Sequence, residues 1–192
     1  MSASDQELSA TVDDSAAVAR RPLHLRRIDL QGFARDDGLF EIEAALLDTK
    51  AIDYPILSGT RRAGEPVHRM RIRLVFDRRF AVHGLQALTE ASPYPGACEQ
   101  IAPDYSVLVG CNLFDGFRRV VTERFGGTAG CAHLTELLFA LPTAALQTLA
   151  TLVREDEGEA QPYQLDRCHA LALDGAVVRS YYPRWYRVAA KD

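Results

Sequence analysis

The sequence predicts an α+β fold in which an antiparallel β-meander carries helices packed on one face. Two observations predict it. Apolar and polar residues alternate along three successive segments of the first half, and apolar residues recur at helical spacing in the second half. A chain of 192 residues, 47% hydrophobic and 25% charged, is long enough for one well-buried core. Residues 1–20 lack apolar periodicity, so we expect a disordered tail followed by a single domain over residues 21–192.

The three predicted strands each show the period of two that is typical of a half-buried strand. In residues 39–50 four apolar side chains, from Phe40 to Leu46, alternate with other residues. In residues 67–76 four large apolar side chains alternate with three arginines, and residues 80–92 form a weaker strand that ends at a proline-rich turn. Their order along the chain predicts antiparallel neighbours.

The second half predicts helices. Residues 112–127 place apolar side chains on one side and end at a pair of glycines, which is typical of a helix stop. Residues 128–141 predict a second helix, with Thr128 as its cap and leucines at helical spacing. Pro142 is expected to kink or end that helix.

Charge and composition exclude several classes of partner. The net charge of −4 and the pI near 5.7 provide no general attraction for nucleic acid or for an anionic membrane, and no apolar run approaches the length of a membrane span. The amino terminus has no secretory pattern, so we expect a cytoplasmic protein. The four cysteines are irregularly spaced, which indicates free thiols rather than disulfides.

Strand parity brings polar side chains toward one end of the sheet. Asp48 and Lys50 continue the buried face of the first strand, and His68 precedes the buried face of the second. If the strands pair antiparallel, Glu90 at the end of the third strand and Tyr94 and Cys98 after it return to the same end of the sheet. A polar residue just beyond an apolar strand marks only the end of the strand about as often as it belongs to a site. A register slip of one residue would turn Asp48, Lys50 and His68 toward solvent.

The start of the second predicted helix adds a histidine to this end of the sheet. His133 flanks the leucine stripe, so it could join the polar cluster beneath the helix N-terminus. Glu136 follows by three residues and could either orient the His133 ring or lie exposed as an ordinary helix glutamate. For Cys131, packing as a small apolar residue is favoured over metal ligation.

Four blocks of the sequence, taken together, resemble the bacterial family catalogued as domain of unknown function 2889. The blocks are RDDGLFEIEAALLDTK, AGEPVHRMRIRLVF, EASPYPGACEQIAPDYSVLVG and FGGTAGCAHLTELL. The resemblance runs from about residue 22 to residue 150, and the usual family pattern has threonine where this chain has Ala132. It implies a bacterial protein associated with the catabolism of aromatic compounds.

A fainter likeness concerns architecture alone. Three strands, a cysteine after the third strand and a Cys/His element at a helix start look like NifU-type iron-sulfur scaffold domains, so the fold class is expected to be NifU/SufE-like. Only Cys98 and the pair Cys131 and His133 have counterparts in that pattern.

Our first functional hypothesis is a small-molecule enzyme that works by general acid and base chemistry without an organic cofactor. The sequence has no phosphate loop, dinucleotide fingerprint, HExxH or GxSxG motif. A histidine would transfer the proton, a carboxylate would orient its ring, and a cation would stabilise an anion. The candidate catalytic residues are His133, His68, Asp48, Lys50 and Glu136, and the candidate substrate-binding residues are Arg35, Tyr94 and Tyr105. Elimination of an aldehyde or water from a phenolic substrate needs only such groups, so we expect a lyase.

The alternative hypothesis is a metal-binding or iron-sulfur carrier protein. Cys98, Cys131 and His133 are ligand types that zinc or iron accepts, although their spacing matches no standard zinc finger. A small molecule is the expected partner of the enzyme, and homo-oligomers are compatible with both hypotheses.

Overall fold

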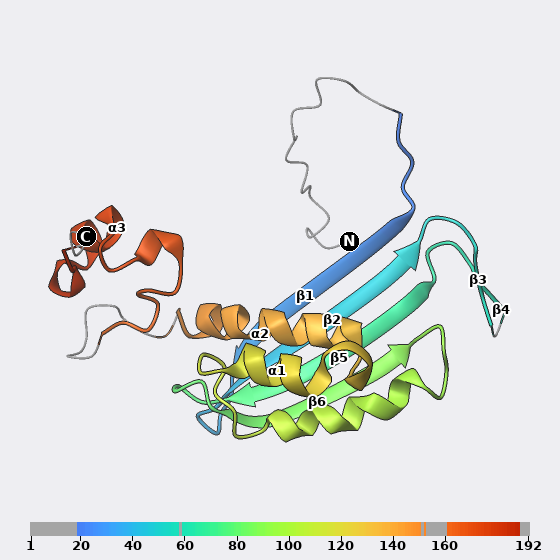
Figure 1. The fold of residues 1–192 in the computed structure, drawn as a ribbon, viewed down its shortest axis with the longest axis horizontal. Coiled ribbons are helices and arrows are strands. Elements are labelled where there is room, and N and C mark those ends of the chain that lie inside the picture. The colour runs from blue at the N-terminus through green and yellow to red at the C-terminus, as the bar shows by residue number, and fades with distance from the viewer. Residues whose placement is uncertain (1–18, 58, 151, 153–160, 189–192) are drawn as a thin grey trace.

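A four-stranded antiparallel sheet forms the centre of the fold (Figure 1), and the predicted α+β architecture is confirmed. The computed structural model of the chain describes residues 19–57, 59–150, 152 and 161–188. The predicted disordered tail therefore lies almost entirely outside the described residues. The sheet order is β1-β2-β5-β6, and its strands are β1 (His24–Ala34), β2 (Phe40–Lys50), β5 (Pro66–Phe76) and β6 (Val82–Ala91).

Strand β1 is a fourth strand that the alternation in the sequence did not predict. It pairs with β2 over its whole length, from His24 opposite Lys50 to Ala34 opposite Phe40. As an edge strand it is exposed nearly throughout, and only its core-facing residues Ile28 and Leu30 are partly buried. Its apolar periodicity is weak for that reason.

The core lies between one face of the sheet and the helices. The inward side chains of β2 and β5, such as Ile42, Leu46 and Ile72, are almost completely buried. Above them lie η1 (Cys98–Leu108), α1 (Phe117–Phe125), η2 (Gly127–Ala129) and α2 (Ala132–Ala150) (Figure 1). A small hairpin of β3 (Tyr54–Ile56) and β4 (Gly59–Arg61) connects β2 to β5 at one end of the sheet.

The prediction that Pro142 ends the second helix is wrong, because α2 runs through this residue to Ala150. A proline inside a helix costs about 3 kcal/mol. Burying one leucine contributes about 1.5–3 kcal/mol, and α2 buries residues on both sides of the proline, including Leu138, Leu141 and Leu149. Packing of the whole helix on the sheet therefore outweighs the local cost.

The described C-terminal residues form a separate small cluster. Leu165, Leu173 and Val178 are its buried residues, and it includes η3 (His169–Leu171), α3 (Ala176–Tyr181) and η4 (Pro183–Trp185). The charged composition of residues 154–164 predicts a loop, and most of these residues lie outside the described part of the chain. None of the described helices has the length and apolar character required to cross a membrane.

Gly32 permits the close approach of α2 to β1, and replacing it by alanine is expected to destabilise the fold. A Cβ atom at Gly32 would lie 1.9 Å from Oγ1 and 2.8 Å from Cβ of Thr148, so rotation of the threonine cannot relieve the clash. We expect a loss of about 1–3 kcal/mol in the free energy of unfolding, measured with urea. Gly84→Ala on β6 is the matched control, because its Cβ would lie 3.7 Å from the nearest atom of Val75. Equal losses in the two variants would contradict this account.

Candidate functional site

The pairing of β2 with β5 places two predicted site residues side by side. Asp48 lies near the end of β2, directly opposite His68 near the start of β5, and both side chains point to the helix-covered face. Asp48 is only 3% exposed, while the His68 side chain is 19% exposed. The antiparallel arrangement predicted from strand parity is therefore confirmed for this pair.

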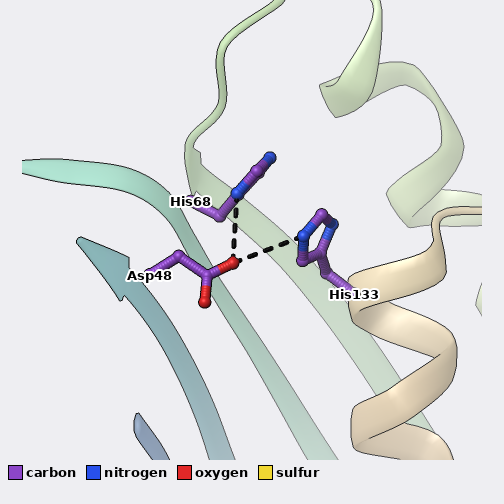
Figure 2. Close-up of side chains that lie close together, drawn as sticks. All are labelled: Asp48, His68 and His133. Atoms are coloured by element: carbon purple, nitrogen blue, oxygen red, sulfur yellow. Dashed lines mark ion pairs between the residues drawn. The ribbon is translucent and has the colours of Figure 1, made fainter. Parts of the chain in front are cut away.

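His133 reaches the same point from the first turn of α2 (Figure 2). Oδ2 of Asp48 lies 3.2 Å from Nδ1 of His68 and 3.4 Å from Nε2 of His133. The two imidazole rings are stacked, with their centroids 3.8 Å apart. One carboxylate oxygen thus faces two imidazoles in a half-buried cluster, which we call the Asp–His–His cluster.

Two residues of β1 complete the surroundings of Asp48. Arg26 holds the carboxylate with two hydrogen bonds of 2.8 Å, from Nε to Oδ1 and from Nη2 to Oδ2. Nε2 of His24 lies 2.9 Å from Oδ1. The other terminal nitrogen of Arg26 donates to Glu136 on α2, so this arginine connects the carboxylate to the helix. Bidentate pairs of this kind fix both the position and the charge of a carboxylate.

The electrostatics keep the carboxylate charged. Burial by itself would raise the pKa of Asp48, but the hydrogen bonds from Arg26 and His24 and the charge of Arg26 together hold this pKa well below its usual range. The carboxylate is therefore ionised at neutral pH.

The two imidazoles, unlike the carboxylate, are held in their neutral form. Burial, followed by the charge of the neighbouring His133, lowers the pKa of His68. Burial also lowers the pKa of His133, against the attraction of Asp48, which raises it. Both rings are thus mainly neutral at neutral pH and available as proton acceptors.

The nitrogens of the two rings differ in what they face. His68 Nδ1 is buried and lies near Asp48, but its alignment is too poor for a hydrogen bond. The Nε2 atom of this ring points away from the carboxylate (Figure 2). In His133, Nε2 faces Asp48 while Nδ1 lies 3.9 Å from Sγ of Cys131.

A buried tyrosine fixes the start of α2. The Tyr105 hydroxyl accepts a hydrogen bond of 2.8 Å from the backbone N–H of Cys131, and the N–H of Thr135 donates to the carbonyl of Cys131. Burial raises the pKa of Tyr105, so the hydroxyl remains protonated. Tyr105 was predicted to bind substrate, but it lies fully buried behind the site and positions the helix that carries His133.

Three other predicted residues do not join the cluster. The Lys50 ammonium lies over the ring of Tyr54, 5.5 Å from its centroid. Arg35 lies beyond the far end of β1 and pairs with Asp37 and Glu41. Tyr94 is 56% exposed in the loop after β6.

The predicted metal-ligand set differs from the group that the structure brings together. Among the described residues, the ligand atoms of Asp48, His68 and His133 all lie within 4.8 Å of one another. That group contains neither Cys98 nor Cys131, and the described cysteines are free thiols.

His24 and Arg26 are the site residues that sequence analysis missed. The signal that could have identified them is parity: they share the inward face of β1 with Ile28 and Leu30. Recognition of β1 as a strand would have placed Arg26 opposite Asp48.

Comparison with known protein families gives a match over more than half of the chain. A family model described as a protein of unknown function, DUF2889, matches residues 24–147. No curated protein and no solved structure matches the chain. The likeness to NifU-type scaffolds therefore finds no support among solved structures.

Proposed function

Because the chain belongs to the DUF2889 family, whose function is unknown, we propose a function from the site itself: a cofactor-independent enzyme that uses general acid and base chemistry on a small molecule. The observation that carries the proposal is the Asp–His–His cluster, in which an ionised carboxylate contacts two half-buried neutral imidazoles. General bases of this kind contribute roughly 100-fold to 10,000-fold in rate.

His68 is the better placed of the two bases. With Nδ1 protonated and facing Asp48, its Nε2 lone pair points away from the carboxylate and can accept a proton from a substrate. Hydrogen bonds at catalytic groups are often poorly aligned before substrate binds. His133 then supports the neighbouring ring by stacking and retains its own contact to Asp48.

The reaction that we propose is elimination from a phenolic substrate. A phenol becomes a quinone methide when it loses its phenolic proton and a leaving group, water or an alkoxide, from its benzylic carbon. Where the next carbon bears a hydroxymethyl group, the imidazole takes the hydroxyl proton and the bond to the hydroxymethyl carbon breaks. The electron pair of that bond restores the aromatic ring as a phenolate, and the aldehyde leaves. Return of the proton to the phenolate regenerates the imidazole, so the step needs no oxidant or metal.

Release of an aldehyde or water from phenolic compounds tests this proposal. Purified protein treated with a chelator should convert at least one member of a panel of phenols that carry a benzylic leaving group beside a hydroxymethyl-bearing carbon, detected as free aldehyde or as an alkene product. The His68→Gln variant should be on the order of 100-fold slower, whereas His83→Gln should match the wild type, because His83 pairs with Asp77 elsewhere in the fold. Equal rates in the two variants would remove His68 from the mechanism.

A second candidate, a mononuclear metal centre, is supported by the distances within the same cluster. Two histidines and one carboxylate form a common ligand set for iron and zinc. The separations of 3.2 and 3.4 Å between ligand atoms are near those expected around one such ion. The double hydrogen bond from Arg26 argues against this candidate, because it places a positive charge beside the same oxygen.

Elemental analysis of untagged protein separates the two candidates. About one equivalent of zinc or iron in the wild type, lost in Asp48→Asn, would favour the metal centre. Activity that persists after chelation, in protein without bound metal, would favour acid and base chemistry.

A further inference from the structure

The face of the sheet opposite the helices is open in the described part of the chain. Its central strand β5 presents Arg69, Arg71 and Arg73 to solvent. Helix α2 contacts only the other face, through β1, β2 and β5 (Figure 1). A hollow of about 600 Å³ lies on the open face, lined in part by Asp29, Ala45 and Arg71.

The side chains on this face form rows that cross all four strands. The register places Gln31 beside Glu43, Glu43 beside Arg73, and Arg73 beside Gln86. The acidic side chain of this row thus lies on β2 and the basic one on β5, with an amide at each end.

The neighbouring row follows the same division of charge. Asp29 lies on β1 and Arg71 on β5, with Ala45 between them and Leu88 on β6. In these two rows the acidic side chains therefore lie on β1 and β2, and the basic side chains lie on β5.

This arrangement is complementary to itself, and we propose that two copies of the chain associate through the open faces of their sheets. A two-fold axis that runs along the strands, midway between β2 and β5, places β2 of one copy over β5 of the other and β1 over β6. It also keeps each cross-strand row over the same row of the second copy. Glu43 then faces Arg73 of the second copy and Gln31 faces Gln86. Arg71, whose Nε pairs with Glu90 of its own chain at 3.0 Å, lies over Ala45.

The groups on this face are available for these contacts. Arg73 uses Nη2 to bind Glu41 at 2.7 Å, and a guanidinium has further N–H donors. Glu43 lies beside Arg73 but has no hydrogen-bond partner among the described residues. A second copy therefore supplies a partner to each.

The available area is close to what a stable dimer needs. With strands about 4.8 Å apart and a rise of about 3.4 Å per residue, four strands of this length cover about 700 Å². A typical specific interface buries about 800 Å² on each partner. Sheets that stack face to face keep their strands within about 30° of each other, as this axis requires.

Charge reversal tests the dimer, with the molar mass measured by sedimentation equilibrium on the full chain. The wild type should be a dimer, and Glu43→Arg should weaken association on the order of tenfold or more, because the two-fold axis creates two arginine–arginine contacts. The charge swap, Glu43→Arg with Arg73→Glu, should restore association. Glu123→Arg is the control: it makes the same charge change on exposed α1, on the helix-covered side, and should leave the dimer intact.

Three results would overturn the proposal: a monomeric wild type at the highest soluble concentration, a Glu43→Arg variant that dimerises as tightly as the wild type, or a charge swap that remains as weak as the single variant. Circular dichroism of each variant establishes that the fold is retained. The test involves no residue of the Asp–His–His cluster, so its outcome is independent of the proposed function.

Discussion

Asp48→Asn is expected to lower the free energy of unfolding by about 3 kcal/mol, the lower end of the range for breaking a buried ion pair. The carboxylate is almost fully buried, and asparagine removes its charge and leaves the Arg26 guanidinium one acceptor oxygen instead of two, with an amide N–H donor in place of the other. We choose the lower end because the Arg26 side chain is 32% exposed and water can compensate part of the loss. Urea unfolding at neutral pH measures the effect.

A matched variant shows whether removing an exposed carboxylate lowers the free energy of unfolding as much as removing the buried one. Asp53 pairs with Arg62 at 2.8 Å, but both side chains are largely exposed. Asp53→Asn should therefore cost about 0.5 kcal/mol or less. If Asp48→Asn unfolds at the same urea concentration as Asp53→Asn, the buried pair with Arg26 does not contribute as the structure implies.

The same pair predicts the direction of the pH dependence. The folded-state pKa of Asp48 is lowered, so the unfolded state binds more protons at acid pH. The contribution of Asp48 should be complete above the unfolded pKa of about 3.9 and decrease as the pH falls toward the folded value. The stability difference between wild type and Asp48→Asn should therefore be constant near neutral pH and shrink below about pH 4.

Strand parity predicted the most important part of the site. Alternation along β2 and β5 sets which residues face the core, and an antiparallel meander places the end of one strand beside the start of the next. Those two facts bring Asp48 opposite His68 without any knowledge of the helices. His133 was a weaker prediction, because a helix start can be recognised in the sequence while its position over the sheet cannot.

The same extrapolation failed for Lys50, for a local reason. Lys50 keeps the parity of β2, because the pairing with β1 is regular to its end and places Lys50 opposite His24, but its long flexible side chain carries the ammonium to the β3 hairpin. The Lys50 ammonium accordingly lies on Tyr54.

The positions of Arg35 and Tyr105 outside the Asp–His–His cluster have a different origin. Both depend on where a loop or helix directs a side chain in three dimensions, which period and spacing do not encode. His24 and Arg26 were missed because an exposed edge strand has little apolar alternation.

The pH profile of turnover should distinguish the roles of the two histidines. If neutral His68 is the base, kcat/KM should rise with pH and level off above an apparent pKa lower than the usual 6.5, because burial and the charge of His133 favour the neutral ring. His68→Gln should remove this acid limb and reduce turnover on the order of 100-fold or more. The same lowered pKa means that the unfolded state binds more protons below about pH 6.5, so stability should also fall as the solution is acidified.

His133→Gln provides the comparison, because glutamine keeps a polar side chain at this position but cannot carry a positive charge. Removing that charge should move the apparent pKa of the remaining acid limb upward, since His133 is one cause of the lowered pKa of His68. The two rings are in contact and titrate as a coupled pair, so the wild-type profile reports apparent values that belong to both. An acid limb that vanishes in His133→Gln and persists in His68→Gln would assign the base to His133, with His68 as its stacking neighbour. An acid limb that persists unchanged in both variants would place the titrating base outside the Asp–His–His cluster.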